Sequence, residues 1–91
     1  MPTVFKYRGY VIYFWSNESN EPVHIHISKG RQSKNSIKVW LTYGGGVLLS
    51  NNNNAKIPSK DLNYILDKVL SNWLMIADMW VDLFGTINFI S

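Results

Sequence analysis

The sequence predicts an α+β fold: an antiparallel sheet of four to five short strands with a C-terminal helix or helix pair packed on one face. Apolar and polar residues alternate through much of the first 50 residues, which is the period of half-buried strands. Short segments rich in Gly, Asn and Ser separate these runs, as expected of tight turns. From Ser59 onward, apolar residues recur every three or four positions, which is the period of an amphipathic helix.

The first two strands are predicted on either side of a hairpin turn at Arg8-Gly9. Residues 3–8 alternate, whereas Tyr10 to Trp15 are aromatic or β-branched throughout. A strand of that composition is typical of the centre of a sheet, covered on both faces. Residues 16–22, which contain Ser, Asn and Glu and end in Pro22, predict a turn.

Three further strands follow in the predicted sheet. The run "VHIHIS" at 23–28 alternates strictly, and 36–41 alternates again. Gly44 to Gly46 predict a flexible turn or a bulge, with a short strand at 47–49 after them. Asn51 to Asn54 predict a loop, because asparagine tolerates left-handed turn geometry.

The helical segment is expected at about 59–84. Ser59 suits an N-cap, and Asp61 lies in the first turn, where the helix dipole favours negative charge. A break is possible at Ser71-Asn72, and Gly85 suits the residue that follows a helix. The tail "TINFIS" either pairs as an edge strand or stays loose. The expected organisation is a single domain over 1–91, with strands at about 3–50, a loop at 51–58 and a tail at 85–91.

Composition limits the class of protein. The 91 residues fit one small domain, and 46% hydrophobic residues are enough to pack a core. The absence of cysteine excludes disulfides and thiolate chemistry. The most apolar segment is interrupted by Asp78 and Asp82, and the N-terminus lacks an apolar leader core. A cytoplasmic protein with no membrane partner is expected, and a homo-oligomer would cover apolar surface that so small a core leaves exposed.

Charge is distributed unevenly along the chain. The net charge is +3, and most cations precede Lys60, whereas four acids lie in the C-terminal third. This asymmetry suits a nucleic-acid partner on the first half of the chain, and it also fits an ordinary solvated surface.

His24 and His26 are the main candidates for a chemical site. Residues i and i+2 on a strand point the same way, roughly 6.5–7 Å apart at their Cα atoms. If Val23, Ile25 and Ile27 face the helix, the two imidazoles face outward together. Lys38 and Trp40, from the next strand, would join them on that face.

Three functions are open to this pair. In a metal-free ribonuclease-like enzyme, His24 and His26 would act as acid and base, Lys38 and Arg31 would hold phosphate, and Trp40 or Tyr13 would stack on a base. In a divalent-metal site the two histidines would need a third and a fourth ligand, and the nearest carboxylates are those of the preceding loop. No other cofactor is expected. Alternatively, the histidines lie on a solvated or partner-binding face.

The helical segment offers two further observations. Trp73 and Trp80 are seven residues apart on its apolar stripe and predict core packing. Met75 and Met79 flank that stripe, where they either fill gaps or form a partner-facing edge.

The chain also resembles a known family. Pro22-x-His24-x-His26-x-x-x-Gly30, with Ser59, Asn72 and Trp80 further along, is similar to the small bacterial domain of unknown function DUF4160. Members resemble one half of two-gene modules that also encode a second small protein. The resemblance therefore implies a protein-interaction component of a toxin–antitoxin-like module with a small partner protein. It marks His24, His26 and Gly30 as family positions.

Overall fold

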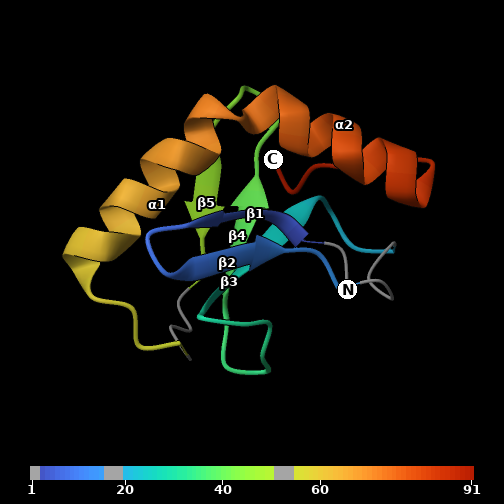
Figure 1. Ribbon diagram of the computed structural model, residues 1–91. Helices are drawn as coiled ribbons and strands as arrows, with labels where there is room; N and C mark the ends of the chain where they lie inside the picture. Colours follow the sequence, from blue (N-terminus) through green and yellow to red (C-terminus); the bar gives the residue numbers. More distant parts are fainter. Residues whose placement is uncertain (1–2, 16–19, 51–54) are drawn as a thin grey trace.

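The computed structural model describes residues 3–15, 20–50 and 55–91 (Figure 1). Five strands are followed by two helices, and the α+β prediction is confirmed. The elements are β1 (Thr3–Tyr7), β2 (Tyr10–Tyr13), β3 (His24–Lys29), β4 (Ile37–Leu41), β5 (Val47–Leu49), α1 (Ser59–Ser71) and α2 (Trp73–Phe84). The asparagine loop predicted at 51–54 lies outside the described residues. Neither helix is long and apolar enough to cross a membrane, and the described residues contain no other helix.

The sheet is an antiparallel meander in the order β1-β2-β3-β4-β5. The predicted turn at Arg8-Gly9 is confirmed, and both residues have positive φ, 54° and 84°. Two consecutive left-handed residues match the twist of a two-residue hairpin. Gly30 also has positive φ, and its amide donates to the Gly9 carbonyl at 2.9 Å. The β1–β2 turn and the end of β3 are therefore held together.

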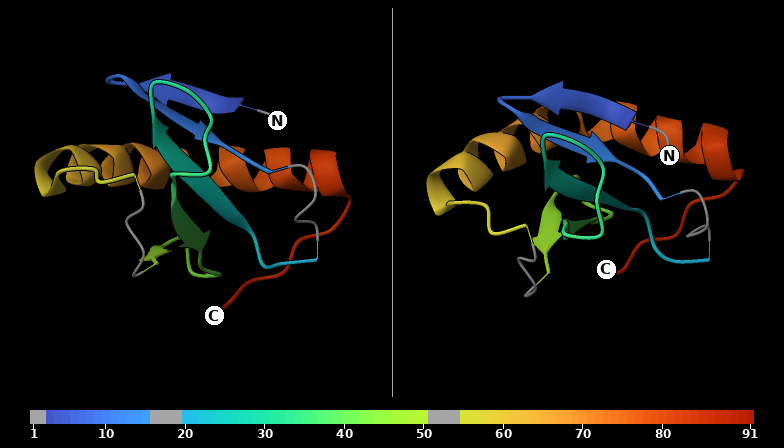
Figure 2. Two further views of the ribbon diagram at one scale, coloured as in Figure 1. Left: turned by 90° about the horizontal axis from the view of Figure 1, so that it is seen from below. Right: turned by 60° about the horizontal axis from the view of Figure 1, so that its bottom comes forward.

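The two helices lie end to end along one face of the sheet (Figures 1 and 2). That face carries the inward residues of three neighbouring strands, which are all buried. The first group, on and just after β2, is Tyr10, Ile12 and Phe14. The second, on and just before β3, is Val23, Ile25 and Ile27. The third, on β4, is Ile37, Val39 and Leu41. The helices contribute Leu62, Ile65, Val69, Ile76, Ala77 and Trp80. All four residues of β2 are buried, which confirms a central strand covered on both faces.

The helix boundaries follow the local sequence with one exception. The break predicted at Ser71-Asn72 is confirmed, since α1 ends at Ser71 and Asn72 separates it from α2. Gly85 ends α2 in the left-handed conformation, with φ 82°. The predicted N-cap at Ser59 is wrong: Ser59 is the first helical residue, and Pro58 precedes it with no side-chain cap. The Pro58 carbonyl accepts the first helical hydrogen bond, from Leu62.

The C-terminal tail forms no strand, but it is not loose. The Val23 amide donates to the Asn88 carbonyl, and the Tyr43 amide donates to the Ser91 carbonyl. Phe89 stacks on Trp73, with ring centroids 5.9 Å apart. The tail is therefore fastened to the segment before β3 and to the end of β4.

A partly buried hydrogen bond joins the sheet to α1. The Tyr10 hydroxyl donates to the Asp61 carboxylate at 2.6 Å. Burial, followed by this hydrogen bond and the charge of Asp61, raises the pKa of Tyr10 from 10.0 to about 12. The neutral phenol is thus favoured in the folded state.

We expect Tyr10→Phe to lower the free energy of unfolding by about 1–3 kcal/mol at pH 8, because Asp61 loses a donor. A folded-state pKa above the unfolded one means that this contribution is complete below pH 10 and is lost as pH rises to about 12. Urea unfolding at pH 8 and pH 11 should therefore show the two proteins converging in stability. Tyr43→Phe is the control, because Tyr43 is 77% exposed. An equal gap between Tyr10→Phe and the parent at both pH values would contradict the prediction.

Candidate functional site

The two histidines lie on the same face of β3, as predicted. His24 is paired with Trp40 and His26 with Lys38, while Ile25 between them points toward the helices. The imidazole centroids are 5.1 Å apart, with an interplanar angle of 77°. The alternation of β3 therefore brings the two rings into contact.

The expectation that this face is open is wrong. His24 is 1% exposed and His26 is 6% exposed. Over Tyr13 and His26, part of the cover comes from the connection between β3 and β4, residues 30–36, which folds back over this face (Figure 2). Ser36 Oγ lies 3.1 Å from His26 Nδ1, and the Ser33 carbonyl accepts a hydrogen bond from Tyr13. Residues 30–36, which the sequence predicts only as the end of β3, thus contribute to covering the histidine face.

His24 is held by a hydrogen bond to the backbone and by contacts with neighbouring rings. Its Nδ1 lies 2.8 Å from the Pro22 carbonyl oxygen. A carbonyl only accepts, so Nδ1 carries the proton. The rings of Trp40 and Trp80 lie 5.1 and 5.4 Å from the imidazole. Pairing between β2 and β3 ends at His26, so Trp80 of α2 can approach His24 where β2 no longer flanks β3.

Tyr13 cannot stack on a nucleobase in this conformation, because its side chain is not exposed. It is 0% exposed and stacks on His26, with centroids 5.6 Å apart and planes at 24°. Its hydroxyl proton goes to the Ser33 carbonyl at 2.7 Å, so Ser28 Oγ, at 2.8 Å, donates to the tyrosine oxygen. Tyr13 is therefore a fixed part of the interior in this conformation.

The two cations expected to hold phosphate are not brought together. Lys38 lies beside His26, but its Nζ donates to the Glu21 carboxylate at 2.9 Å and sits 4.7 Å from the Trp40 ring centroid. Arg31 is exposed beyond the last residue of β3. An acid–base reaction needs a substrate within hydrogen-bond reach of the imidazoles. The burial of both rings prevents that approach in this conformation.

A metal ion would need more ligands than the pair supplies. Within the described ranges, no three His, Cys, Asp or Glu side chains converge. Glu18, one of the nearby carboxylates, lies outside those ranges. Two buried imidazoles alone give half of a tetrahedral zinc site. His24 and His26 remain the candidate ligands, and that function stays a prediction.

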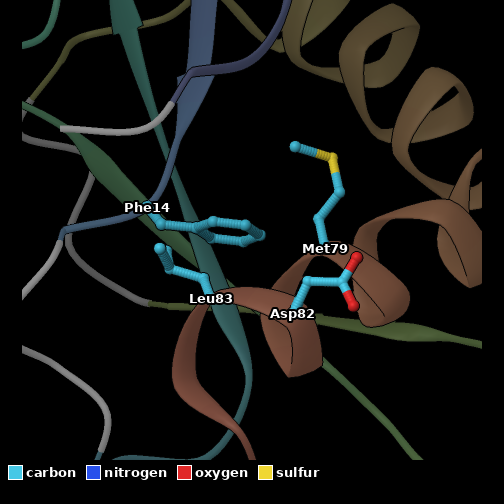
Figure 3. A pocket seen from close by; sticks show the side chains of 4 residues that line it. All are labelled: Phe14, Met79, Asp82 and Leu83. Atoms are coloured by element: carbon cyan, nitrogen blue, oxygen red, sulfur yellow. The ribbon is translucent and has the colours of Figure 1, made fainter.

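A second candidate site, which sequence reasoning did not assemble, lies beside α2. Phe14, Met79, Asp82 and Leu83 line an open hollow of about 320 Å³ (Figure 3). The sequence places Met79 on a possible partner-facing edge, but it assigns no site role to Phe14 or Asp82. One signal was available: Asp82 lies in the last turn of α2, where the dipole disfavours negative charge.

The fold and these sites define a small α+β protein with an interior histidine–aromatic cluster beneath a closed loop. A family model described as "Domain of unknown function (DUF4160)" matches residues 9–81. The match spans most of the chain, and the chain belongs to this family. His24, His26 and Gly30 lie within the matched residues. No curated protein and no solved structure matches the chain.

Proposed function

We propose that this chain is a protein-interaction component of a two-gene, toxin–antitoxin-like module, and that the outer face of α2 binds the small partner protein. The observation that supports this most is the exposed apolar surface of that helix. Leu74 is 73% exposed, and Met75, Val81 and Leu83 are 40%, 38% and 44% exposed. Leu74 and Val81 are seven residues apart, or about two helical turns, so they lie on one side of the helix with Asp78 between them. Met75 and Leu83 lie further round the helix. Exposed apolar patches of this kind are typical of binding sites.

The charges on α2 indicate the chemistry of the partner. The helix carries Asp78 and Asp82, both exposed, and has no lysine or arginine. A carboxylate in the last turn works against the helix dipole, at a cost of about 0.3–1 kcal/mol. Cations on a partner would offset this cost. We therefore infer a partner surface with apolar anchors flanked by lysine or arginine.

The interior of the protein fits this function better than catalysis. Both histidines are buried, and Lys38 is already paired with Glu21. The surface of α2, by contrast, is accessible without rearrangement. The kind of partner proposed, a small protein encoded by an adjacent gene, rests on the resemblance to members of DUF4160.

The test is binding of that neighbouring protein, measured by calorimetry, to the native chain and to Leu74→Glu. We expect the substitution to weaken binding at least about tenfold, because it places a charge in the apolar contact. Leu48→Glu is the matched control, since Leu48 is 48% exposed on β5. We expect it to change affinity by less than about threefold.

Two results would contradict the proposal. Equal weakening by Leu74→Glu and Leu48→Glu would remove α2 as the binding surface. Absence of binding between the two native proteins would remove the neighbouring gene product as the partner.

A further inference from the structure

The charges of the protein are separated toward opposite ends of the molecule. All nine Lys and Arg residues lie between positions 6 and 68, and residues 69–91 contain only Asp78 and Asp82 as charged side chains. Figure 1 shows the β1–β2 turn beside α1, whereas α2 extends away from both. The end that carries α1 and the turn is the more basic one, because the turn adds Arg8 to a helix that holds two lysines and two aspartates. The charged side chains of α2 are two aspartates.

Cations from two elements meet on α1. Lys60, Tyr64 and Lys68 are four residues apart and share one stripe of this helix. The guanidinium of Arg8, from the β1–β2 turn, lies 4.1 Å from the Tyr64 ring centroid. The ammonium of Lys68 lies 5.4 Å from the Tyr7 ring centroid. The turn thus places its arginine over the middle of the helical stripe.

The side chains of Arg8, Lys60 and Lys68 are exposed. Among the described residues, the ion pair within 4 Å is Lys38–Glu21, so none of the three is neutralised by a carboxylate of that part of the chain. Two acids lie on the same helix: Asp61 accepts the Tyr10 hydroxyl, and Asp67 is exposed next to Lys68.

Two further cations extend the basic end across the neighbouring turn. Lys29 pairs with Tyr10 across β2 and β3, and the Gly30 amide is bonded to the Gly9 carbonyl. Arg31 follows directly. The end of β3 therefore brings Lys29 and Arg31 next to the turn that carries Arg8.

We propose that this basic end, defined by Arg8, Lys29, Arg31, Lys60 and Lys68, binds the phosphate backbone of a nucleic acid without reading its sequence. Lys60 and Lys68 are eight residues apart, or about 12 Å along the helix. That length matches three or four phosphates of one strand, whose axial rise is about 3.4 Å. Arg8 and Lys68 already cover the Tyr64 and Tyr7 rings, which favours phosphate contacts over base stacking. A sequence pI of about 9.3 agrees with such a footprint.

This inference is separate from the proposed protein partner. The basic end lies on the β1–β2 turn and α1, and the protein-binding face lies on α2. A nucleic acid and a partner protein can therefore bind at the same time.

The test is fluorescence anisotropy with a labelled DNA duplex of about 20 base pairs and an RNA duplex of the same sequence. Three phosphate contacts predict that affinity falls about 40-fold between 50 and 200 mM salt. Lys60→Gln/Lys68→Gln should weaken binding and lower the salt slope by about two. Lys6→Gln/Lys34→Gln removes the same charge from outside the basic end and should leave that slope unchanged.

Three outcomes would overturn the inference, once circular dichroism shows that each variant is folded. The first is an equal effect of the two double substitutions, which would mean diffuse attraction rather than a site. The second is no binding of either duplex at 50 mM salt. The third is equal competition by an acidic polypeptide, which would assign this surface to an acidic protein. Equal affinity for the DNA and RNA duplexes would support recognition of the phosphate backbone. A higher affinity for one duplex would identify it as the preferred nucleic acid.

Discussion

Trp80→Ala is expected to lower the free energy of unfolding by about 3–5 kcal/mol. Trp80 is 1% exposed. Its centroid lies 5.5 Å from Phe14, 4.3 Å from Phe84 and 5.4 Å from His24. Truncation would leave a cavity where α2 meets the sheet. Small domains are typically stable by about 5–15 kcal/mol, so this one change removes a large share of the stability.

The measurement is urea unfolding followed by circular dichroism, with Leu74→Ala as the control on the same helix. Leu74 is 73% exposed, so its truncation should cost less than about 0.5 kcal/mol. Trp80→Phe keeps a ring in the site and should lose less unfolding free energy than Trp80→Ala. It therefore provides a measurement even if the alanine variant does not fold. Similar stabilities for the Trp80→Ala and Leu74→Ala variants would show that Trp80 does not join α2 to the sheet.

The parts of the fold that sequence predicts best are those encoded locally. The β1–β2 turn follows from a glycine at a left-handed position, and the helix end at Gly85 follows from the same property. The apolar stripe of the helices and the shared face of His24 and His26 follow from residue periodicity. The N-cap at Ser59 was misplaced by one residue, because Pro58 takes that position without a side-chain cap.

Exposure is not encoded in the same way, and this is why the candidate site was misjudged. Alternation states which side of a strand a residue faces, but not what covers that side. The cover here comes from Ser33 and Ser36, which bond to Tyr13 and His26. One signal did exist: a strand at Tyr10–Trp15 covered on both faces implies that its neighbour β3 is also covered.

The charge arrangement could be predicted only in part. That cations precede Lys60 is visible in the sequence. That Lys38 is paired with Glu21, and that Arg8 lies over Tyr64, depends on contacts between residues 17 and 56 positions apart. Such contacts exist only after the sheet and α1 have packed. The distinction between a paired and an unpaired cation therefore requires the structure.

The second large effect is expected for His24→Ala, at about 2–5 kcal/mol of unfolding free energy. His24 is buried among Trp40, Trp80 and His26, and its Nδ1 is the donor to the Pro22 carbonyl. Alanine would remove both the ring and the donor. His24→Phe keeps a ring in the site and removes both ring nitrogens, so it should cost less, about 1–3 kcal/mol.

The comparison of these two variants separates an interior role from a chemical one. If His24 is a packing residue, the partner-binding affinity of folded His24→Phe should equal that of the native chain, whereas His24→Ala should lose binding only in proportion to its unfolded fraction. If instead His24→Ala unfolds at the same urea concentration as the native protein, the histidine cluster is not part of the stable interior. Such a result would return His24 and His26 to consideration as an accessible acid–base or metal-binding pair.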